Sequence, residues 1–199
     1  PAGPRGCFSE PAVRGVLQQL ASALRYIHGE DVVHRDLKAS NVFVTARGVV
    51  KIGDFGVAMA PSLRVTEVGG DNSAPDSLIG TVSHLSPEVC DGHPHGKPAD
   101  CWAFGVLVYN LCALELPFRG ENALVVVTRI AEAKPEPLPQ VYSRHLRDFC
   151  ASLLRVDIIR RLTAAEAAEQ LDDESNAGAG QGVLRGGDWC DRGMAPLAG

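Results

Sequence analysis

The chain has 199 residues, enough for one domain with a hydrophobic core, or for one domain and a tail. Its composition, 45% hydrophobic and 22% charged, is that of an ordinary globular protein rather than a disordered or fibrous one. Lysine and arginine number 19 against 24 acidic residues, a net charge of −5, and no long basic run occurs. Nucleic acid is therefore not expected as a partner, because binding phosphate backbones usually needs a concentrated positive face.

The cysteines and the apolar segments give no sign of secretion or of a membrane span. The 6 cysteines are scattered, so reduced thiols are expected rather than the disulfide framework of a small secreted chain. The longest apolar stretch, 102–116, is interrupted by Asn110 and Glu115 and is too short to span a bilayer. Residues 1–8 lack a signal-peptide pattern and are expected to be the ragged start of a chain that begins mid-protein. We expect no membrane partner and a cytoplasmic location, with the nucleus or the cytoskeleton as alternatives.

A long amphipathic helix is expected near the N-terminus, from Ser9 to Gly29. Ser9 can cap it, Pro11 suits its first turn and Gly29 can end it. Apolar residues recur at intervals of three and four, the spacing of one helix face. They are Val13, Val16, Leu17, Leu20, Leu24 and Ile27.

Short extended runs are expected next, over 31–34, 41–45 and 49–52. The turn at 46–48 joins the last two runs and predicts a β-hairpin. Residues 61–79 are rich in Gly, Ser, Pro and Asp and show little periodicity, so a mobile loop is expected there.

The second half of the chain is expected to be helical. Its most hydrophobic segment, from 99 to about 114, is apolar on nearly every side, which predicts a helix that is buried all round and ended by Pro117. Further helices are expected over 122–133, 143–154 and 163–171.

The end of the helical region is marked by composition. Thr163 and Glu166 form a capping-box pattern at the start of the last helix. From 172 onward glycine dominates and periodicity ends, so 172–199 is expected to be a disordered tail. The predicted fold class is mainly α with a small β-hairpin, in one domain over 9–171.

Three short motifs stand in order along the chain. Residues 34–41 read His-Arg-Asp-Leu-Lys-Ala-Ser-Asn, 54–56 read Asp-Phe-Gly after a predicted strand, and 86–88 read Ser-Pro-Glu. Any single tripeptide arises by chance, but all three in this order, with a loop of sensible length between them, are very specific. They resemble the catalytic loop, the D-F-G motif and the A-P-E motif of protein kinases.

The resemblance covers roughly 8–171 and implies the C-terminal lobe of the protein-kinase fold, with an activation segment over 54–88. Residues 100–105, Asp-Cys-Trp-Ala-Phe-Gly, are similar to the D-x-W-x-x-G start of the buried central helix of that lobe. Lys38 is the choice typical of serine/threonine rather than tyrosine kinases. Several segments are further similar to the NIMA-related kinases, among them 41–44, 51–56 and 111–118.

This resemblance implies transfer of the γ-phosphoryl group of ATP, with Mg²⁺, to a serine or threonine of a protein substrate. Such catalysis is mostly positioning and charge neutralisation. Asp36 would accept the hydroxyl proton and Lys38 would neutralise the γ-phosphate, while Asn41 and Asp54 would hold Mg²⁺, which prefers oxygen ligands. Taken alone, Asp36 is more readily a turn-capping aspartate and Lys38 a solvated lysine, and the complete motif favours the catalytic roles.

Other residues take supporting roles by the same resemblance. Thr81 would contact the catalytic aspartate and lysine. Phe43 would form the floor under the adenine ring, with ordinary core packing as the alternative. His34 and Phe55 would pack in the internal spine rather than act as acid–base groups.

Structural and regulatory contacts are implied as well. Asp100 would anchor the catalytic-loop backbone, and Arg161 would pair with Glu88 in a buried ion pair whose loss costs several kcal/mol. Arg35 would receive a phosphate from the activation loop, with Ser77 as its acceptor and a merely solvated serine as the alternative. The partners expected are a protein substrate and an upstream kinase, or a second copy acting by trans-autophosphorylation.

The sequence also departs from the kinase pattern. No glycine-rich loop, V-A-I-K lysine or αC glutamate precedes the helix at Ser9, which leaves half an ATP cleft and is attributed to truncation. Ala39 replaces the usual proline and Ser86 the usual alanine, and Ile158 and Leu162 replace the prolines that flank the last motif. None of these changes removes a catalytic group.

Rival interpretations stand beside the enzyme. One is a kinase-like scaffold that binds partners without transferring phosphate. The sequence upstream of Pro1 would decide between this scaffold and the enzyme. An ATP hydrolase of the P-loop kind is disfavoured, because no G-x-x-x-x-G-K-[ST] occurs. His93 and His95 suggest a metal site, but no third ligand is evident, so a solvated loop is expected there.

Overall fold

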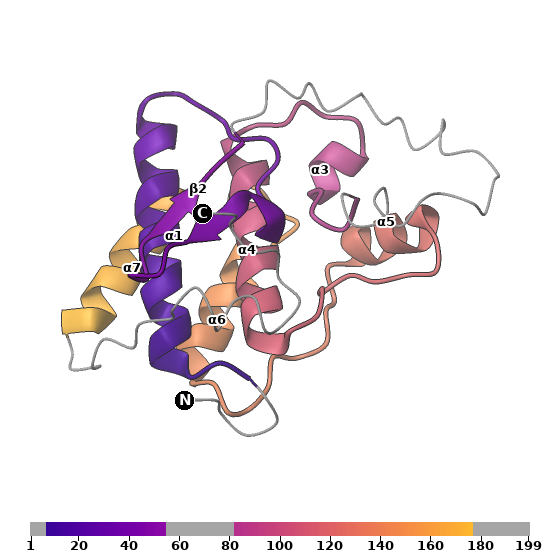
Figure 1. Ribbon diagram of the computed structural model, residues 1–199. Helices are drawn as coiled ribbons and strands as arrows, with labels where there is room; N and C mark the ends of the chain where they lie inside the picture. The colour runs from indigo at the N-terminus through magenta and orange to yellow at the C-terminus, as the bar shows by residue number, and fades with distance from the viewer. Residues whose placement is uncertain (1–6, 55–81, 177–199) are drawn as a thin grey trace.

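The computed structural model describes residues 7–54 and 82–176, which form a mainly helical domain with one small antiparallel sheet (Figure 1). Its elements are α1 (Glu10–Gly29), the 3-10 helix η2 (Ala39–Asn41), β1 (Val42–Val44), β2 (Val50–Ile52), α3 (Pro87–Cys90), α4 (Lys97–Ala113), α5 (Ala123–Glu132), α6 (Arg144–Leu153) and α7 (Ala164–Asn176). The predicted class, mainly α with a small hairpin, is confirmed for this part of the chain.

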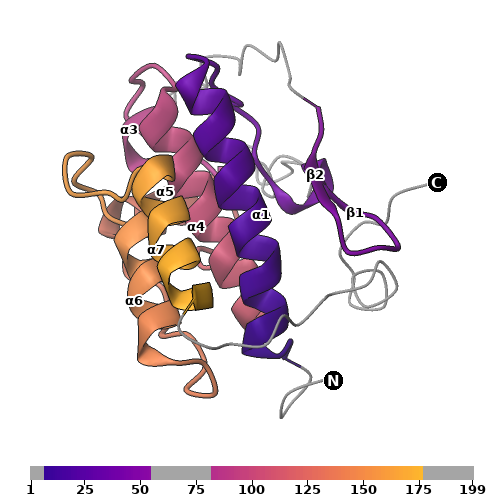
Figure 2. The ribbon, with the colours of Figure 1, turned by 90° about the vertical axis from the view of Figure 1, so that its left-hand side faces the viewer.

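Helix α4 forms the centre of the core. Every residue from 99 to 109 is buried, as its all-round apolar sequence predicts. Helices α1 and α6 pack on it, and α7 packs on α1 (Figure 2). The Trp102 ring stacks on Phe118 with centroids 5.5 Å apart, and Phe104 meets Phe149 of α6 edge to face at 6.1 Å. None of the described helices has the length and hydropathy of a bilayer span.

Helix α1 confirms the helix predicted from Ser9 to Gly29, and its predicted apolar face is buried. Ser9 occupies the N-cap position, but its side chain makes no capping hydrogen bond. The carboxylate of Glu10 instead accepts hydrogen bonds from the backbone N–H and the hydroxyl of Ser143, both at 2.6 Å. These bonds tie the start of α1 to the start of α6.

The predicted hairpin forms and lies against α1. Its register pairs Val42 with Ile52, and Gly48 takes a φ of 78° in the turn, where a side chain would be strained. The side chain of Gln19 on α1 donates from Nε2 to the carbonyl oxygen of Gly48 at 3.1 Å and accepts from the N–H of Val50 at 2.9 Å. One amide thus fixes the hairpin to the helix.

The extended run predicted over 31–34 is not a strand. Its backbone donors are satisfied elsewhere, because the N–H of Val32 bonds to the carbonyl of Ile27 at 2.9 Å and that of His34 to the carboxylate of Asp100 at 2.7 Å. A side-chain acceptor on another element has taken the place of a neighbouring strand.

Two predicted helix boundaries also need correction. Helix α4 begins at Lys97 rather than at 99. Pro98 is tolerated in the first turn because N–H groups there have no acceptor within the helix, so the lack of one costs nothing. Helix α7 runs to Asn176, past 171, where the tail was expected to begin. The added turns of α7 carry no apolar residue, so hydrophobic periodicity could not reveal them. The capping box predicted at Thr163 and Glu166 is confirmed, with three hydrogen bonds of 2.7, 2.9 and 3.3 Å.

The contact between α4 and α6 leaves no room for a side chain at Gly105. A Cβ added there would lie 2.8 Å from Cβ of Leu153 and 2.9 Å from Cδ2 of Leu154. We expect Gly105→Ala to lower the free energy of unfolding by about 1–3 kcal/mol through overpacking, although alanine favours helices more than glycine. Urea unfolding measures this.

The matched control is Gly29→Ala at the end of α1, where an added Cβ meets nothing within 4 Å. Its free energy of unfolding should stay within about 0.5 kcal/mol of the parent. Equal stability of the two variants would contradict the close α4–α6 contact.

Candidate active site

The carboxylate of Asp100, in the first turn of α4, organises the candidate site. It is fully buried and accepts four hydrogen bonds, two on each oxygen. Oδ2 accepts from the backbone N–H of His34 at 2.7 Å and from Nε2 of His28 at 3.0 Å. Oδ1 accepts from the backbone N–H of Arg35 at 2.9 Å and from Nε2 of His95 at 3.3 Å. Since the loop 34–41 begins with two of these donors, α4 fixes its backbone.

These bonds keep Asp100 charged. Burial alone would raise its pKa, but the hydrogen bonds from His28, His95 and the two backbone N–H groups outweigh burial and hold the pKa well below its ordinary value. The N-terminal end of the α4 dipole favours the same negative charge. Within the described ranges, a carboxylate is therefore held inside the core without lysine or arginine as its partner.

The ring of His34 links the loop to the end of β2. Its Nδ1 accepts from the N–H of Asp36 at 3.3 Å, so Nε2 is the nitrogen that donates to the carbonyl oxygen of Gly53 at 3.0 Å. The N–H of Gly53 in turn donates to the carbonyl oxygen of Asn41 at 2.9 Å. Both backbone polar groups of Gly53, the residue before Asp54, are therefore hydrogen-bonded to the loop 34–41.

The side chains of Asp36, Lys38 and Asn41 converge on this loop. Nζ of Lys38 lies 3.0 Å from Oδ1 and 2.8 Å from Oδ2 of Asp36, so the ammonium faces both oxygens. Nδ2 of Asn41 donates to Oδ2 of Asp36 at 3.0 Å and to its backbone oxygen at 2.8 Å. The side chains of Asp36 and Lys38 are 30% and 26% exposed, so a ligand can reach them.

Asp54 and Phe43 lie at the end of the hairpin. Asp54 is exposed and takes a φ of 51°, and Arg35 takes a φ of 70°; left-handed backbone at non-glycine residues gathers at functional sites. The half-buried ring of Phe43 lies so close to Gly53 that a Cβ there would be 2.2 Å from Cε2 of the ring. Only glycine can therefore precede Asp54 with the ring in this place.

Glu88 and Arg161 form the predicted ion pair, and it is bidentate. Nη1 lies 2.7 Å from Oε1 and Nη2 lies 2.9 Å from Oε2, with the side chains 1% exposed for Arg161 and 11% for Glu88. The other N–H bonds of the guanidinium go to the backbone carbonyls of Arg155, Pro98 and Val156. The pair ties α3 to the loop before α7.

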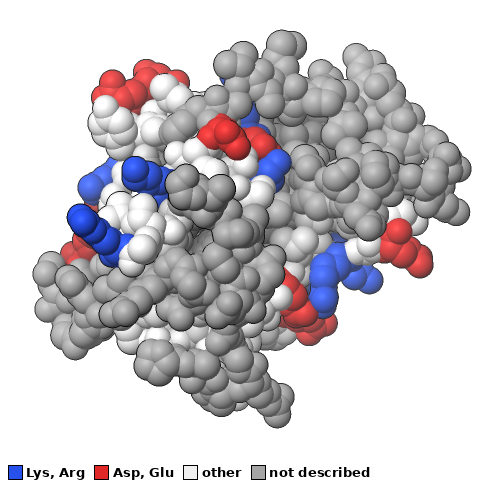
Figure 3. Space-filling view, viewed as in Figure 1, with Lys and Arg blue, Asp and Glu red and all other residues white. Residues whose placement is uncertain are grey.

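Charges of both signs share the face seen in Figure 3. Over the described residues of this face, blue lysine and arginine side chains lie among red aspartate and glutamate side chains, without one broad field of either sign. At Asp36 the described charges form a local pair, with Nζ of Lys38 2.8 Å from Oδ2.

Comparison with known proteins gives the family. The sequence model of the protein kinase domain matches residues 3–171. The chain belongs to the protein kinase family. It is 35% identical over 150 residues to serine/threonine-protein kinase Nek5 of Homo sapiens, a match that covers 75% of this chain and 20% of the relative. It is 40% identical over 136 residues to serine/threonine-protein kinase Nek4 of Mus musculus, covering 68% of this chain and 16% of that protein.

A third relative is serine/threonine-protein kinase nekl-2 of Caenorhabditis elegans, 34% identical over 158 residues, 79% of this chain and 42% of the relative. The chain is therefore a NIMA-related kinase-like protein, as the segments at 41–44 and 51–56 indicate. It spans less than half the length of each of these relatives.

Several predicted kinase residues are not placed. Phe55, Ser77 and Thr81, and the loop expected over 61–79, lie outside the described residues, so their roles stay predictions. Arg35 is described, with its backbone bonded to Asp100 and its side chain exposed.

The sequence motifs do not predict two histidines of this candidate site. His28 belongs to no motif, and His95 was expected in a solvated loop, which is wrong: its side chain is 11% exposed and bonds to Asp100. Its Nδ1 is buried and finds no partner among the described residues. The neighbouring His93 is exposed, and no group of three or more His, Cys, Asp or Glu in the described ranges is placed to hold a metal ion.

The Glu88–Arg161 pair gives a stability prediction. Arg161→Ala leaves a buried carboxylate unpaired, so we expect the free energy of unfolding at pH 7 to fall by about 3–5 kcal/mol. The control Arg155→Ala removes an exposed arginine of the same loop and should change it by less than about 0.5 kcal/mol. Urea unfolding measures both.

The same pair predicts a pH dependence. Burial would raise the pKa of Glu88, but the bonds from Arg161 lower it overall. A lowered pKa contributes stability above the unfolded-state pKa, near 4.3, that is lost as pH falls through the folded-state value. The stability gap between the parent and Arg161→Ala should therefore narrow below about pH 4. A gap that stays constant down to pH 3 would contradict this.

His95 gives a third prediction, measured by hydrogen exchange. His95→Phe removes one donor from Asp100, and we expect the amides of His34 and Arg35 to exchange about tenfold faster, since one hydrogen bond to a charged group contributes about 1.5 kcal/mol. His95→Gln, whose amide nitrogen can reach the same oxygen, should restore the slow exchange. Equal acceleration in α6 would show global destabilisation, and unchanged exchange at 34 and 35 would show that His95 does not hold the loop.

Proposed function

We propose that the chain forms the helical C-terminal lobe of a serine/threonine protein kinase, which transfers the γ-phosphoryl group of ATP to a serine or threonine hydroxyl of a protein substrate. The observation that carries the proposal is the Asp36 carboxylate, held by the side chains of Lys38 and Asn41. The loop that presents it is bonded to a buried carboxylate of α4. The relatives, named serine/threonine-protein kinases, support the same activity.

In this proposal the side chain of Asp36 accepts the proton of the substrate hydroxyl. Two donors fix its orientation while the carboxylate stays partly exposed, so a hydroxyl can approach the lone pairs that remain. Lys38 lies beside it with an ammonium group that would neutralise negative charge on the γ-phosphate. Because phosphoryl transfer needs positioning and charge neutralisation more than covalent help, this pair suits the reaction.

Asn41 and Asp54 fit Mg²⁺ by the chemistry of their donors. Mg²⁺ prefers oxygen ligands, and Asn41 has its amide nitrogen engaged with Asp36, which leaves Oδ1 as an acceptor. Asp54 adds an exposed carboxylate on a backbone anchored at Gly53. When bound, Mg²⁺ would offset the negative charge of the ATP phosphates. Phe43, whose ring packs on Gly53, is proposed to lie under the adenine.

Activation is proposed to act through the segment 54–88. A phosphate on Ser77 would form charge-assisted hydrogen bonds with the exposed side chain of Arg35, which is adjacent to Asp36 in the chain. Thr81 is proposed to contact Asp36 and Lys38. Both ends of this segment are fixed by hydrogen bonds. Gly53, the residue before it, bonds to His34, and its last residue, Glu88, pairs with Arg161 in the loop between α6 and α7.

The test is phosphate transfer by the full-length protein to a general substrate such as casein. Asp36→Ala should lower turnover by at least ~10²-fold, the scale for losing a general base. Asp148→Ala removes an exposed carboxylate of α6 and should leave turnover unchanged. If Asp36→Ala transfers phosphate as fast as an active parent, Asp36 is no catalytic base. If the parent itself transfers no phosphate, a kinase-like scaffold becomes the better interpretation.

A further inference from the structure

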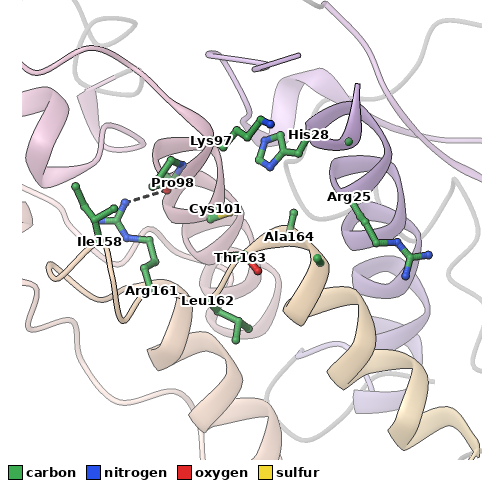
Figure 4. Close-up of a pocket in the computed structure, with 12 residues that line it drawn as sticks. Arg25, His28, Lys97, Pro98, Cys101, Ile158, Arg161, Leu162, Thr163 and Ala164 are labelled. Atoms are coloured by element: carbon green, nitrogen blue, oxygen red, sulfur yellow. Dashed lines mark hydrogen bonds between the residues drawn. The ribbon is translucent and has the colours of Figure 1, made fainter. Parts of the chain in front are cut away.

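A pocket of about 350 Å³ lies apart from the loop 34–41, between the last turn of α1, the first turn of α4 and the start of α7 (Figure 4). Its volume is in the range of specific ligand sites. The apolar part of its wall comes from three segments of the chain. These are Pro98 and Cys101 of α4, Ile158 and Leu162 of the loop before α7, and Ala164 of α7.

The charged groups of this pocket are all cationic. Among the described residues that line it there is no aspartate or glutamate, although the chain as a whole carries a net charge of −5. Arg161 is committed to Glu88 and to backbone carbonyls. The side chain of Arg25 makes no hydrogen bond or ion pair within the described residues. The side chain of Lys97 pairs there only with Asp31, in a surface pair whose side chains are 41% and 91% exposed. Such a pair is weak, so Lys97 can exchange it for another carboxylate.

Bulky apolar side chains continue beyond the pocket. Ile158 at its rim is 43% exposed, and the next residue, Ile159, is 94% exposed. Exposed apolar side chains around a hollow are a feature of surfaces that bind other proteins, and they extend the contact past the size of a small ligand.

We propose that this pocket binds a segment of a partner protein in which a bulky apolar side chain stands beside carboxylates. The apolar side chain would fill the hollow between α4 and α7, and the carboxylates would pair with Arg25 and Lys97. An apolar anchor in a pocket with charges at the rim is the usual division of affinity and selectivity in such contacts.

The pocket also borders the bonds that hold the catalytic loop. His28 lines it, and Nε2 of His28 donates to the same oxygen of Asp100 that accepts from the N–H of His34. A ligand that restrains His28 would therefore restrain Asp100 and the loop. Binding itself does not depend on the proposed kinase function, whereas a change in phosphate transfer does.

The test titrates the full-length protein into fluorescein-labelled, end-blocked peptides and follows fluorescence anisotropy. The probe has the sequence Gly-Asp-X-Asp-Gly, with Trp, Phe or Leu at X, and the controls carry Asn for Asp or Ala at X. We expect saturable binding of at least one acidic probe below about 1 mM, weakened about tenfold by each control change, which corresponds to losing one good contact. No saturable binding by any of the three acidic probes would overturn the proposal.

Two variants locate the binding. Arg25→Glu reverses the free charge, and Ala165→Trp fills the pocket from an exposed position at its edge, so each should weaken binding at least about tenfold. Ala151→Trp, at an exposed alanine of α6 that does not line the pocket, is the matched control. Circular dichroism checks that all three remain folded. Binding that survives both Arg25→Glu and Ala165→Trp would overturn the site.

Other occupants would show distinct results. Equal binding of the acidic and the Asn-containing peptides would mark a plain apolar hollow and contradict the role of charge. Self-association in sedimentation without peptide, lost in Ala165→Trp, would identify a second copy as the occupant and contradict the partner proposed. Slower exchange of the His34 and Arg35 amides on adding the probe should accompany binding, and it is measured whether or not the protein transfers phosphate.

Discussion

The candidate site depends on one buried carboxylate. The backbone N–H groups of His34 and Arg35 belong to no helix or strand and therefore need an acceptor elsewhere. A buried N–H group without an acceptor costs free energy. Asp100 supplies both acceptors from the first turn of a helix that is itself packed on nearly every side. The backbone of the loop is therefore fixed to a rigid part of the core. It can hold Arg35 at a φ of 70°, a conformation that a free loop would not keep, and this turn presents Asp36 to Lys38 and Asn41.

The two ends of the segment from Asp54 to Glu88 are anchored by different kinds of interaction. At its start the anchor is neutral: the carbonyl and N–H of Gly53 bond to His34 and Asn41. At its end the anchor is ionic, a two-point pair in which the guanidinium of Arg161 has its N–H groups engaged and lies 5.1 Å from the centroid of the Trp102 ring. Both anchors converge on α4, since Trp102 follows Asp100 by two residues.

The sequence predicts the parts of this arrangement that repeat or that stand in motifs. The three-and-four spacing of α1 and the all-round apolar α4 define those helices without help, and the resemblance to kinases singles out Asp36, Asp100 and the Glu88–Arg161 pair. What fails is what depends on a distant acceptor. The run at 31–34 has strand-like composition, yet its last amide, that of His34, bonds to a carboxylate 66 residues away. His95 was expected in a solvated loop because nothing periodic connects it to Asp100. Periodicity reports which face of an element is apolar, and it carries no information on which polar group a loop will meet.

The site contains two kinds of charged side chain, which differ in exposure: buried ones that fix the backbone and partly exposed ones that a ligand can reach. Asp100 and Arg161 have side chains 0% and 1% exposed, whereas those of Asp36 and Lys38 are 30% and 26% exposed. Burying charge adds little to net stability, because desolvation offsets most of the attraction between the partners, and apolar residues of the same volume would serve the fold as well. The buried charges are therefore best explained by direction: a carboxylate and a guanidinium set hydrogen bonds at fixed angles, which apolar packing does not. The partly exposed pair in front can then stay open to a ligand without losing its orientation, since the groups behind it do not depend on that ligand for their own bonds.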